Sequence, residues 1–406
     1  MKRIYAALFV LLALSACKKD NPGLKPGKDL ALNATQLQQA SADNTFTFNL
    51  FKTVNAGNTT GQNLFISPLS VSMALGMTAN GASGQTLKAI DSAMSFNRFT
   101  QDQVNAYFNS LLVQLPELDP NTTVKIANSI WYSDKFSVLH DFLQINSKYF
   151  QAKAQSLDFN SPGAVGTINN WISDATSGKI TKLLDQVQPN DVMYLINAIY
   201  FKSTWADKFD ASQTLKMNFY LPGNNAVQAD FMNGRINFNA TGDENAYVIE
   251  LPYSNNKYSM VIAEPASGKT VNDLVAVLDN ATWQKWMSNL HPNNQALSMP
   301  KFQFSYGTDL NNALTSLGMG VAFTPQADLT RINQAGGLDI SKVLHKACIS
   351  VDENGTTAAA ATSVGIQVTD ASPVVINHPF IFVIREMKTG LILFAGIMND
   401  PTQSGS

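Results

Sequence analysis

Residues 352–369 read Asp-Glu-Asn-Gly-Thr-Thr-Ala-Ala-Ala-Ala-Thr-Ser-Val-Gly-Ile-Gln-Val-Thr, and the organisation of the whole chain follows from them. Before them, apolar residues and one histidine recur at every second position from Val343 to Val351, which is the period of a half-buried β-strand. Asp352 to Gly355 is a turn signal. From Thr362 onward, apolar residues again alternate with small or polar ones. The pattern predicts a strand, a turn and a second segment that is able to form a strand.

This second segment has the composition of the interior of a sheet. It contains neither proline nor a charged residue between Asn354 and Thr369, and the first of each afterwards are Asp370 and Pro373. Proline removes a hydrogen-bond donor from a sheet, and an unpaired charge is costly to bury. The segment as far as Thr369 is therefore able to enter the middle of a sheet. The alternative interpretation is an Ala/Thr-rich surface linker, which composition alone favours at least as strongly.

The hinge region of this segment resembles the reactive-loop hinge of the serpins, a family of suicide inhibitors of proteases. The residues that carry this resemblance are Glu353, Gly355, Thr356, Ala358, Ala359, Ala360, Ala361 and Thr362. The resemblance implies an α+β fold in a single domain, with a large central β-sheet, two smaller sheets, about eight or nine helices and an exposed reactive-centre loop. Further motifs in family order extend it from about residue 40 to residue 401.

Residues 63–70 read Asn-Leu-Phe-Ile-Ser-Pro-Leu-Ser, where Ser67 is a good helix N-cap and Pro68 suits the first helical position. The run 192–201 is apolar except for Asn197 and predicts a central strand covered on both faces. The resemblance places Ser67, Ser70, Asn197 and His345 beneath the point where the main sheet opens, a group we call the shutter. It also implies a hydrogen bond between Asn197 and His345.

A second group, the breach, lies at the top of the hinge in the family pattern. Met299-Pro300-Lys301-Phe302 resembles a serpin strand whose lysine pairs with the hinge glutamate. The resemblance therefore implies an ion pair between Lys301 and Glu353, with Trp205 close by. An exposed ion pair contributes only about 0–1 kcal/mol, so we expect its role to be positional.

The remaining pattern predicts helices and strands along the rest of the chain. Expected helices cover Asn44–Val54, Pro68 to about Asn80, Phe136–Phe150 and a segment starting at Ile168. Expected strands cover Ile126–Trp131, Ala154–Phe159, Ala246–Leu251, Tyr258–Ala263, Ile381–Ile384 and Leu391–Phe394.

The N-terminus has the features of a secretory signal, with Lys2-Arg3 followed by an apolar run as far as Ala16. Leu14-Ser15-Ala16-Cys17 resembles a bacterial lipobox, which implies cleavage before Cys17 and acylation of that cysteine. The alternative is an ordinary signal peptide with an incidental cysteine. We thus expect a lipoprotein signal peptide at 1–16, a membrane tether at 17–40 and the folded domain at 41–401. The protein would be lipid-anchored to a bacterial cell envelope, at the outer membrane or cell surface.

Composition argues against several other functions. The chain has 28 Lys and Arg against 30 Asp and Glu, a net charge of −2, so nucleic acid is not an expected partner. Its four histidines and two cysteines form no metal-binding motif, and it has neither a G-x-S-x-G elbow nor a phosphate-binding loop. We expect no enzyme, cofactor or metal. Once Cys17 is acylated, Cys348 has no partner for a disulfide and is expected to be a packed residue.

The scissile bond has two candidates. Spacing from Glu353 in the family pattern indicates Thr369–Asp370, whereas counting back from Pro379-Phe380 indicates Val368–Thr369. Both imply serine proteases that prefer small side chains, of the elastase or subtilisin type. The resemblance thus implies a monomeric suicide inhibitor that traps its protease by inserting the cleaved loop into the central sheet. The alternative is a non-inhibitory serpin that acts as a surface binding protein, although such proteins tend to lack the four hinge alanines.

Overall fold

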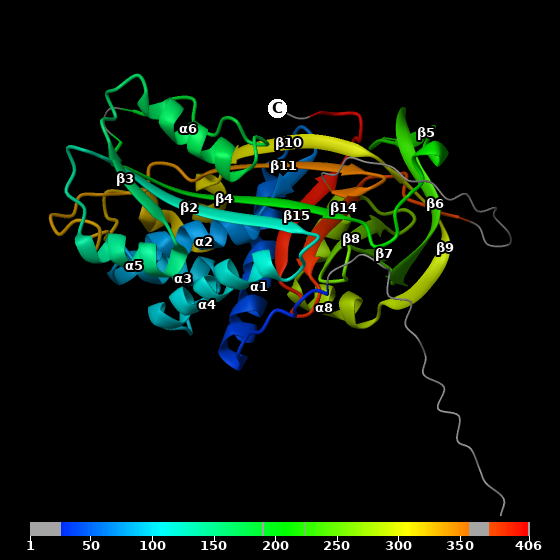
Figure 1. The fold of residues 1–406 in the computed structure, drawn as a ribbon, viewed down its shortest axis with the longest axis horizontal. Coiled ribbons are helices and arrows are strands. Elements are labelled where there is room, and N and C mark those ends of the chain that lie inside the picture. Colours follow the sequence, from blue (N-terminus) through cyan, green and yellow to red (C-terminus); the bar gives the residue numbers. More distant parts are fainter. Residues whose placement is uncertain (1–25, 189–190, 224, 357–372, 405–406) are drawn as a thin grey trace, which may run out of the picture.

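The computed structural model describes residues 26–188, 191–223, 225–356 and 373–404. The predicted signal peptide, Cys17, the hinge residues from Ala358 to Thr362 and both candidate scissile bonds lie outside the described residues. The molecule is elongated, with most helices gathered at one end and a β-rich body at the other (Figure 1). The expected α+β architecture is confirmed, with nine α-helices in the described part of the chain.

The central sheet has six strands in the order β10-β11-β12-β4-β2-β3. Their bounds are β10 Phe302–Asp309, β11 Leu344–Asp352, β12 Gly355–Thr356, β4 Met193–Thr204, β2 Thr123–Ser133 and β3 Lys153–Leu157. All neighbours are antiparallel except β2 and β3, which are parallel. The long strands β2 and β4 run side by side across the molecule (Figure 1).

Helices cover both faces of the central sheet (Figure 1). On one face lies α2, Pro68–Ala79, capped by the Ser67 hydroxyl, which accepts a hydrogen bond from the Ser70 amide as its motif predicted. On the other lies α6, Ala164–Ala175, which packs Ile168 and Ile172 against Trp131 and Ile196 of the sheet. The helix-rich end is completed by α1 Ala34–Ala56, α3 Gly84–Ala93, α4 Gln101–Gln114 and α5 His140–Phe150.

The β-rich end holds a nine-stranded system in the order β1-β15-β14-β8-β7-β6-β9-β13, with β5 also paired to β6. The two smaller sheets expected from the family pattern are joined because the 17-residue β6, Ala226–Gly242, pairs with β5, β9 and β7. The other strands are β1 Leu64–Ile66, β5 Leu215–Tyr220, β7 Ala246–Pro252, β8 Tyr258–Pro265, β9 His291–Pro300, β13 Val374–Val375, β14 Phe380–Glu386 and β15 Ile392–Met398. Three shorter helices are α7 Val271–Val277, α8 Asn280–Ser288 and α9 Asn311–Leu314.

The folded body begins earlier than the sequence indicated. Helix α1 starts at Ala34 rather than Asn44, so residues 34–40, which we expected in the tether, are helical. Asn33 and Gln36 form a capping box in which each side chain accepts from the backbone amide of the other. The polar first turns of this helix lack the apolar period on which the prediction relied. Before the helix, Leu30 is already buried.

Two strand predictions also need correction. The run Met299–Phe302 is not one strand, because β9 ends at Pro300 and β10 begins at Phe302 in the other sheet. Strand β4 is not covered on both faces throughout, since Met193, Tyr194 and Leu195 are only half-buried. The reason is a cavity beside this half of β4, described below. Within the described ranges, no helix has the length and apolarity needed to cross a membrane.

Candidate functional site

The described chain enters the central sheet at β12, directly after the turn that follows β11 (Figure 1). Thr356 pairs with Val351 of β11 on one side and with Ser203 of β4 on the other. Gly355 has a φ of 148°, and a Cβ there would lie 2.1 Å from the Ser203 carbonyl oxygen, so only glycine fits. The start of the hinge is thus already a strand between two strands.

Glu353 anchors this entry point. The Lys301 Nζ lies 3.0 Å from Glu353 Oε1, which confirms the predicted ion pair. The Thr214 hydroxyl donates to the same oxygen at 2.5 Å. Burial raises the pKa of Glu353, but the hydrogen bonds from Thr214 and Lys301 outweigh it and hold that pKa below its ordinary value. The carboxylate is therefore charged at neutral pH, and it fixes the turn from two sides.

Trp205 holds the same turn from the direction of β4. Its indole nitrogen donates to the Asp352 carbonyl at 2.9 Å, and its backbone amide donates to the Asn354 carbonyl at 2.8 Å. The ring stacks on Tyr253 at a centroid distance of 4.6 Å, and the Tyr253 hydroxyl bonds the Thr356 hydroxyl. Lys301, Glu353 and Trp205 thus form one cluster around the start of the hinge.

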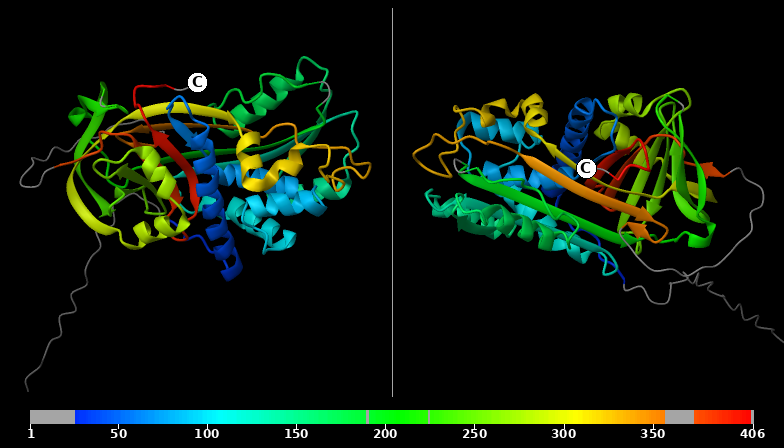
Figure 2. Two further views of the ribbon diagram at one scale, coloured as in Figure 1. Left: turned by 180° about the vertical axis from the view of Figure 1, so that it is seen from behind. Right: turned by 90° about the horizontal axis from the view of Figure 1, so that it is seen from above.

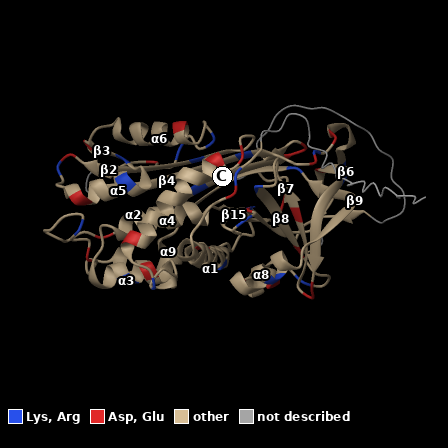
Figure 3. Cartoon of the chain, turned by 60° about the horizontal axis from the view of Figure 1, so that its bottom comes forward, with Lys and Arg blue, Asp and Glu red and all other residues tan. Residues whose placement is uncertain are grey.

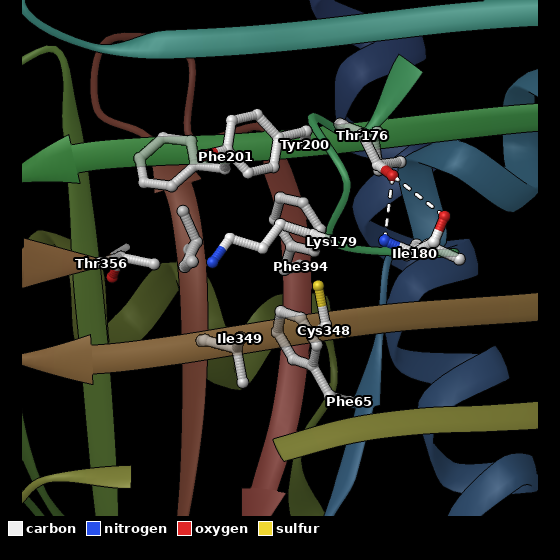
Figure 4. Close-up of a pocket in the computed structure, with 12 residues that line it drawn as sticks. Phe65, Thr176, Lys179, Ile180, Tyr200, Phe201, Cys348, Ile349, Thr356 and Phe394 are labelled. Carbon is white, nitrogen blue, oxygen red and sulfur yellow. Dashed lines mark hydrogen bonds between the residues drawn. The ribbon is translucent and has the colours of Figure 1, made fainter. Parts of the chain in front are cut away.

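Beyond Thr356 the central sheet is open. No backbone ladder joins β4 to β11 among the described residues, since each is paired to the other only through β12. We call this gap the slot. Next to β12 the slot is filled by side chains, including Lys179 and Cys348, which leave a space of about 10 Å³ (Figure 4). Farther along, it widens into a cavity of about 470 Å³.

Three of the predicted shutter residues, Ser70, Asn197 and His345, line this cavity, and the fourth, Ser67, contacts His345. The Ser67 hydroxyl donates to the Leu393 carbonyl at 2.8 Å, and the Ser67 amide donates to His345 Nε2 at 3.1 Å. The Ser70 hydroxyl donates to the Asn197 carbonyl at 3.3 Å. Helix α2 therefore contacts both walls of the slot, β4 through Asn197 and β11 through His345.

The predicted hydrogen bond between Asn197 and His345 was wrong. Asn197 instead donates to Asn128 Oδ1 at 2.6 Å, and its own Oδ1 has no partner among the described residues. The imidazole of His345 has no hydrogen bond in the described chain other than the one from Ser67. The two side chains sit on strands that the slot separates, which is why they do not meet. Burial lowers the pKa of His345 to about 4, so the ring is neutral at pH 7. Because Nε2 accepts, Nδ1 carries the proton.

The linker after α6 covers the outer side of the slot. Ser177 and Gly178 have positive φ values of 54° and 76°, and the Thr176 hydroxyl accepts from the Ile180 amide at 3.0 Å. This tight turn sets Lys179 and Ile180 over the gap between β4 and β11 (Figure 4). The sequence indicated only a helix starting at Ile168 near this linker, and it gave no sign of Thr214 or Tyr253. Their partners are 139 and 103 residues away in sequence, so no local pattern could have indicated them.

The described residues contain no cluster of three or more His, Cys, Asp or Glu side chains able to hold a metal ion. Lys and Arg are interspersed with Asp and Glu in the view of the chain drawn in Figure 3. A sheet with an open slot between β4 and β11, with α2 on one side, a linker across the other and a chain segment entering at one end, is suited to receiving a strand.

The model of the serpin (serine protease inhibitor) family matches residues 41–401. The chain belongs to the serpin family. Among curated relatives of this serpin, the leukocyte elastase inhibitor of Sus scrofa is 34% identical over 382 residues, covering 90% of this chain and all of the relative. Iripin-8 of Ixodes ricinus is 33% identical over 377 residues, covering 89% of this chain and 93% of the relative.

Solved serpin structures have the same fold. The thermophilic serpin Tengpin in its native state is 33% identical, with a TM-score of 0.80, and the match covers 93% of this chain and 97% of Tengpin. Human thyroxine-binding globulin, solved with thyroxine bound, is 28% identical, with a TM-score of 0.85, and the match covers 91% of this chain and all of the globulin. The family thus includes both protease inhibitors and a ligand carrier.

Proposed function

We propose that this serpin is a suicide inhibitor of serine proteases that prefer small aliphatic or hydroxyl side chains. The observation that carries the proposal is β12, which sits between β4 and β11 at the head of an open slot. Gly355 and Thr356 are the first two residues of a strand that the following loop residues would extend on insertion. Among the relatives, the leukocyte elastase inhibitor bears a name that agrees with this protease class.

The chemistry begins with an ordinary attack on the loop. The protease serine Oγ forms a bond with the carbonyl carbon of Thr369, the bond to the nitrogen of Asp370 breaks, and the serine proton passes to the new amino terminus. The protease is then held as an ester of Thr369. Val368–Thr369 is the rival bond, with the same steps. Insertion of the freed loop would carry the esterified protease along before water can hydrolyse the ester.

The register of β12 predicts where each loop residue would lie. Each step beyond Thr356 moves one residue back along β11 and β4, so Ala359 falls opposite Cys348 and Tyr200. Thr356 is buried, so even-numbered loop residues would face the core. The predicted apolar set in the loop is Val364, Ile366 and Val368, which are all even-numbered.

The energy available from insertion is large compared with protein stability. Thirteen residues from 357 to 369 would gain partners on both edges, at about 1 kcal/mol net for each hydrogen bond. Burial of Val364 and Ile366 would add roughly 1.5–3 kcal/mol for each side chain. A gain on the order of 10 kcal/mol exceeds many domains' total stability, so the uncleaved form would be metastable.

The test is to mix the Cys17→Ser protein with pancreatic elastase and, separately, with subtilisin, and to analyse each mixture on SDS gels and by mass spectrometry. We expect an SDS-stable complex and a released peptide that starts at Asp370. Ala360→Arg places a charge on the core face of the inserting strand and should convert the protein from inhibitor to substrate. Ala335→Arg, at an exposed loop position, is the matched control and should inhibit normally.

Other outcomes separate the alternatives. A peptide starting at Thr369 would assign the bond to Val368–Thr369. Cleavage with no complex and no rise in thermal stability would reject inhibition and leave the non-inhibitory surface binding protein. Thyroxine-binding globulin, among the similar structures, is a ligand-binding precedent for that alternative.

We also propose that the chain is anchored to a bacterial envelope through acylated Cys17. The support is the sequence pattern that ends at Cys17. Expression with radiolabelled palmitate should label the wild-type protein and not the Cys17→Ser variant. Equal labelling of the two would contradict the anchor without affecting the inhibitor proposal.

A further inference from the structure

The cavity of about 470 Å³ in the lower slot is a candidate binding site in its own right. Its walls come from α2, from the N-terminal half of β4, from residues 183–188, from residues 191–192 and from residues 337–346. Apolar side chains supply most of them, including Val71, Leu75, Leu184, Leu195 and Ile340. At roughly 30 Å³ per water, the space equals about fifteen water molecules, and its volume is within the range of sites for small organic ligands.

The polar groups in the cavity define the chemistry of a ligand. His345 lines it with an Nδ1–H that donates to nothing in the described chain. Because His345 lines the cavity, an acceptor on a ligand bound there would make a hydrogen bond to this N–H that the described residues do not supply. Three aspartates and two lysines also line the cavity, so their charges nearly balance and give no strong preference for an ion. A neutral, mainly apolar molecule with one carbonyl or hydroxyl oxygen fits these features.

The cavity lies where the loop would insert, so a ligand bound in it would affect insertion. Continuing the register of β12 places Thr362 opposite His345 and Asn197, and Ile366 opposite Met193. Asn197, His345 and Met193 all line the cavity. A molecule bound there would therefore occupy the space that residues 361–366 need on insertion. Ligand and inserted loop would exclude each other.

We propose that the lower slot binds a neutral, amphipathic small molecule that hydrogen-bonds His345 Nδ1–H, and that this ligand blocks completion of the inserted strand. The blocking half rests on the proposed inhibitory function, whereas the binding half does not. With the ligand bound, a protease that attacks the loop would hydrolyse its ester before insertion is complete. The serpin would then behave as a substrate rather than an inhibitor.

The first experiment is a fluorescence titration of the Cys17→Ser protein with 6-propionyl-2-(dimethylamino)naphthalene. This probe is neutral and apolar, and its ketone is a hydrogen-bond acceptor. We expect saturable binding at one probe per chain, with a blue shift of the emission. Ala74→Phe fills the cavity from α2 and Leu338→Trp fills it from another wall. Each should weaken binding at least tenfold, whereas Ala106→Phe, on an exposed face of α4, should not.

The outcomes for the binding site and for the blocking of insertion can be told apart. Absence of saturable binding, or equal binding by the two filling variants and Ala106→Phe, would overturn the site. Thermal melting shows which variants are folded, and either filling variant is sufficient for the comparison. If the probe binds, it should also raise the cleaved fraction and lower the SDS-stable complex with elastase. Binding without that effect would reject the blocking half. If no complex forms even without probe, the proposed inhibition fails and the blocking half fails with it, while the titration still decides the site.

Discussion

Asp43 on α1 is a buried carboxyl group with no positively charged partner among the described residues, and its replacement by asparagine should change how stability depends on pH. Its two oxygens accept hydrogen bonds from the hydroxyl of Ser72 on α2 and, at 2.8 Å, from the hydroxyl of Tyr107 on α4. The side chain is almost wholly buried. Burial raises the pKa of Asp43 from 3.8 to about 7, more than the two hydrogen bonds lower it.

The sign and size of the effect follow from linkage. Because the pKa is higher in the folded than in the unfolded chain, the folded state retains the proton that the unfolded state loses above pH 4. The stability contributed by this group is complete below about pH 4 and is lost as the pH rises through about 7. A shift of about 3 units corresponds to about 4 kcal/mol, of which about 3 kcal/mol is lost between pH 5 and pH 8.

The measurement compares thermal melting of Asp43→Asn and wild type at pH 5 and pH 8. Asparagine is always neutral. The melting temperature of the variant, relative to that of wild type, should therefore rise by several degrees from pH 5 to pH 8, at roughly 2 °C for each kcal/mol. Asp174→Asn, at an exposed position on α6, is the matched control and should show no such gain. If Asp43→Asn lowers the melting temperature equally at both pH values, the carboxyl is ionised and stabilising, and the reasoning is wrong.

Three further predictions concern the hinge, a buried ion pair and the slot. Gly355→Ala should expel β12 from the sheet, because its Cβ would collide with the Ser203 carbonyl; faster limited proteolysis of the loop would reveal this, and an unchanged rate would count against it. Arg385→Met should destabilise the fold by about 3–5 kcal/mol in urea denaturation, because it leaves Glu250 buried without its partner, and adding Glu250→Met should restore most of the loss. Cys348 should react with a thiol reagent at least tenfold more slowly after loop cleavage, because the inserted strand would cover it; an equal rate would contradict the predicted register.

The sequence was sufficient for most of the fold because its signals are local. Ser67 and Pro68 begin α2 as their types require, and the apolar runs on either side of the Lys388–Gly390 turn form β14 and β15. The start of α1 was missed because its capping box joins two polar residues that carry no apolar period. The family pattern, rather than any local signal, correctly paired Lys301 with Glu353.

The state of the slot could not be predicted in the same way. A hydrogen bond between Asn197 and His345 requires β4 and β11 to be adjacent, and in this structure the slot separates them. Residue types alone do not distinguish an open slot from a closed one. A pattern of side chains therefore identified the walls of the slot, Ser67 and Ser70 included, without indicating how far apart these walls stand.

The pairing of β1 with β15 has a consequence for how the chain is made. Leu64 lies opposite Ile397, so β1, near the start of the fold, pairs with β15, which is synthesised almost last (Figure 2). Ser67 at the end of β1 likewise donates to the Leu393 carbonyl, on the same late segment. Closing so long a loop is entropically costly and slow. Until β15 has left the ribosome, β1 therefore lacks the strand with which it pairs in the folded protein, so this part of the nine-stranded sheet can form only when translation is almost complete.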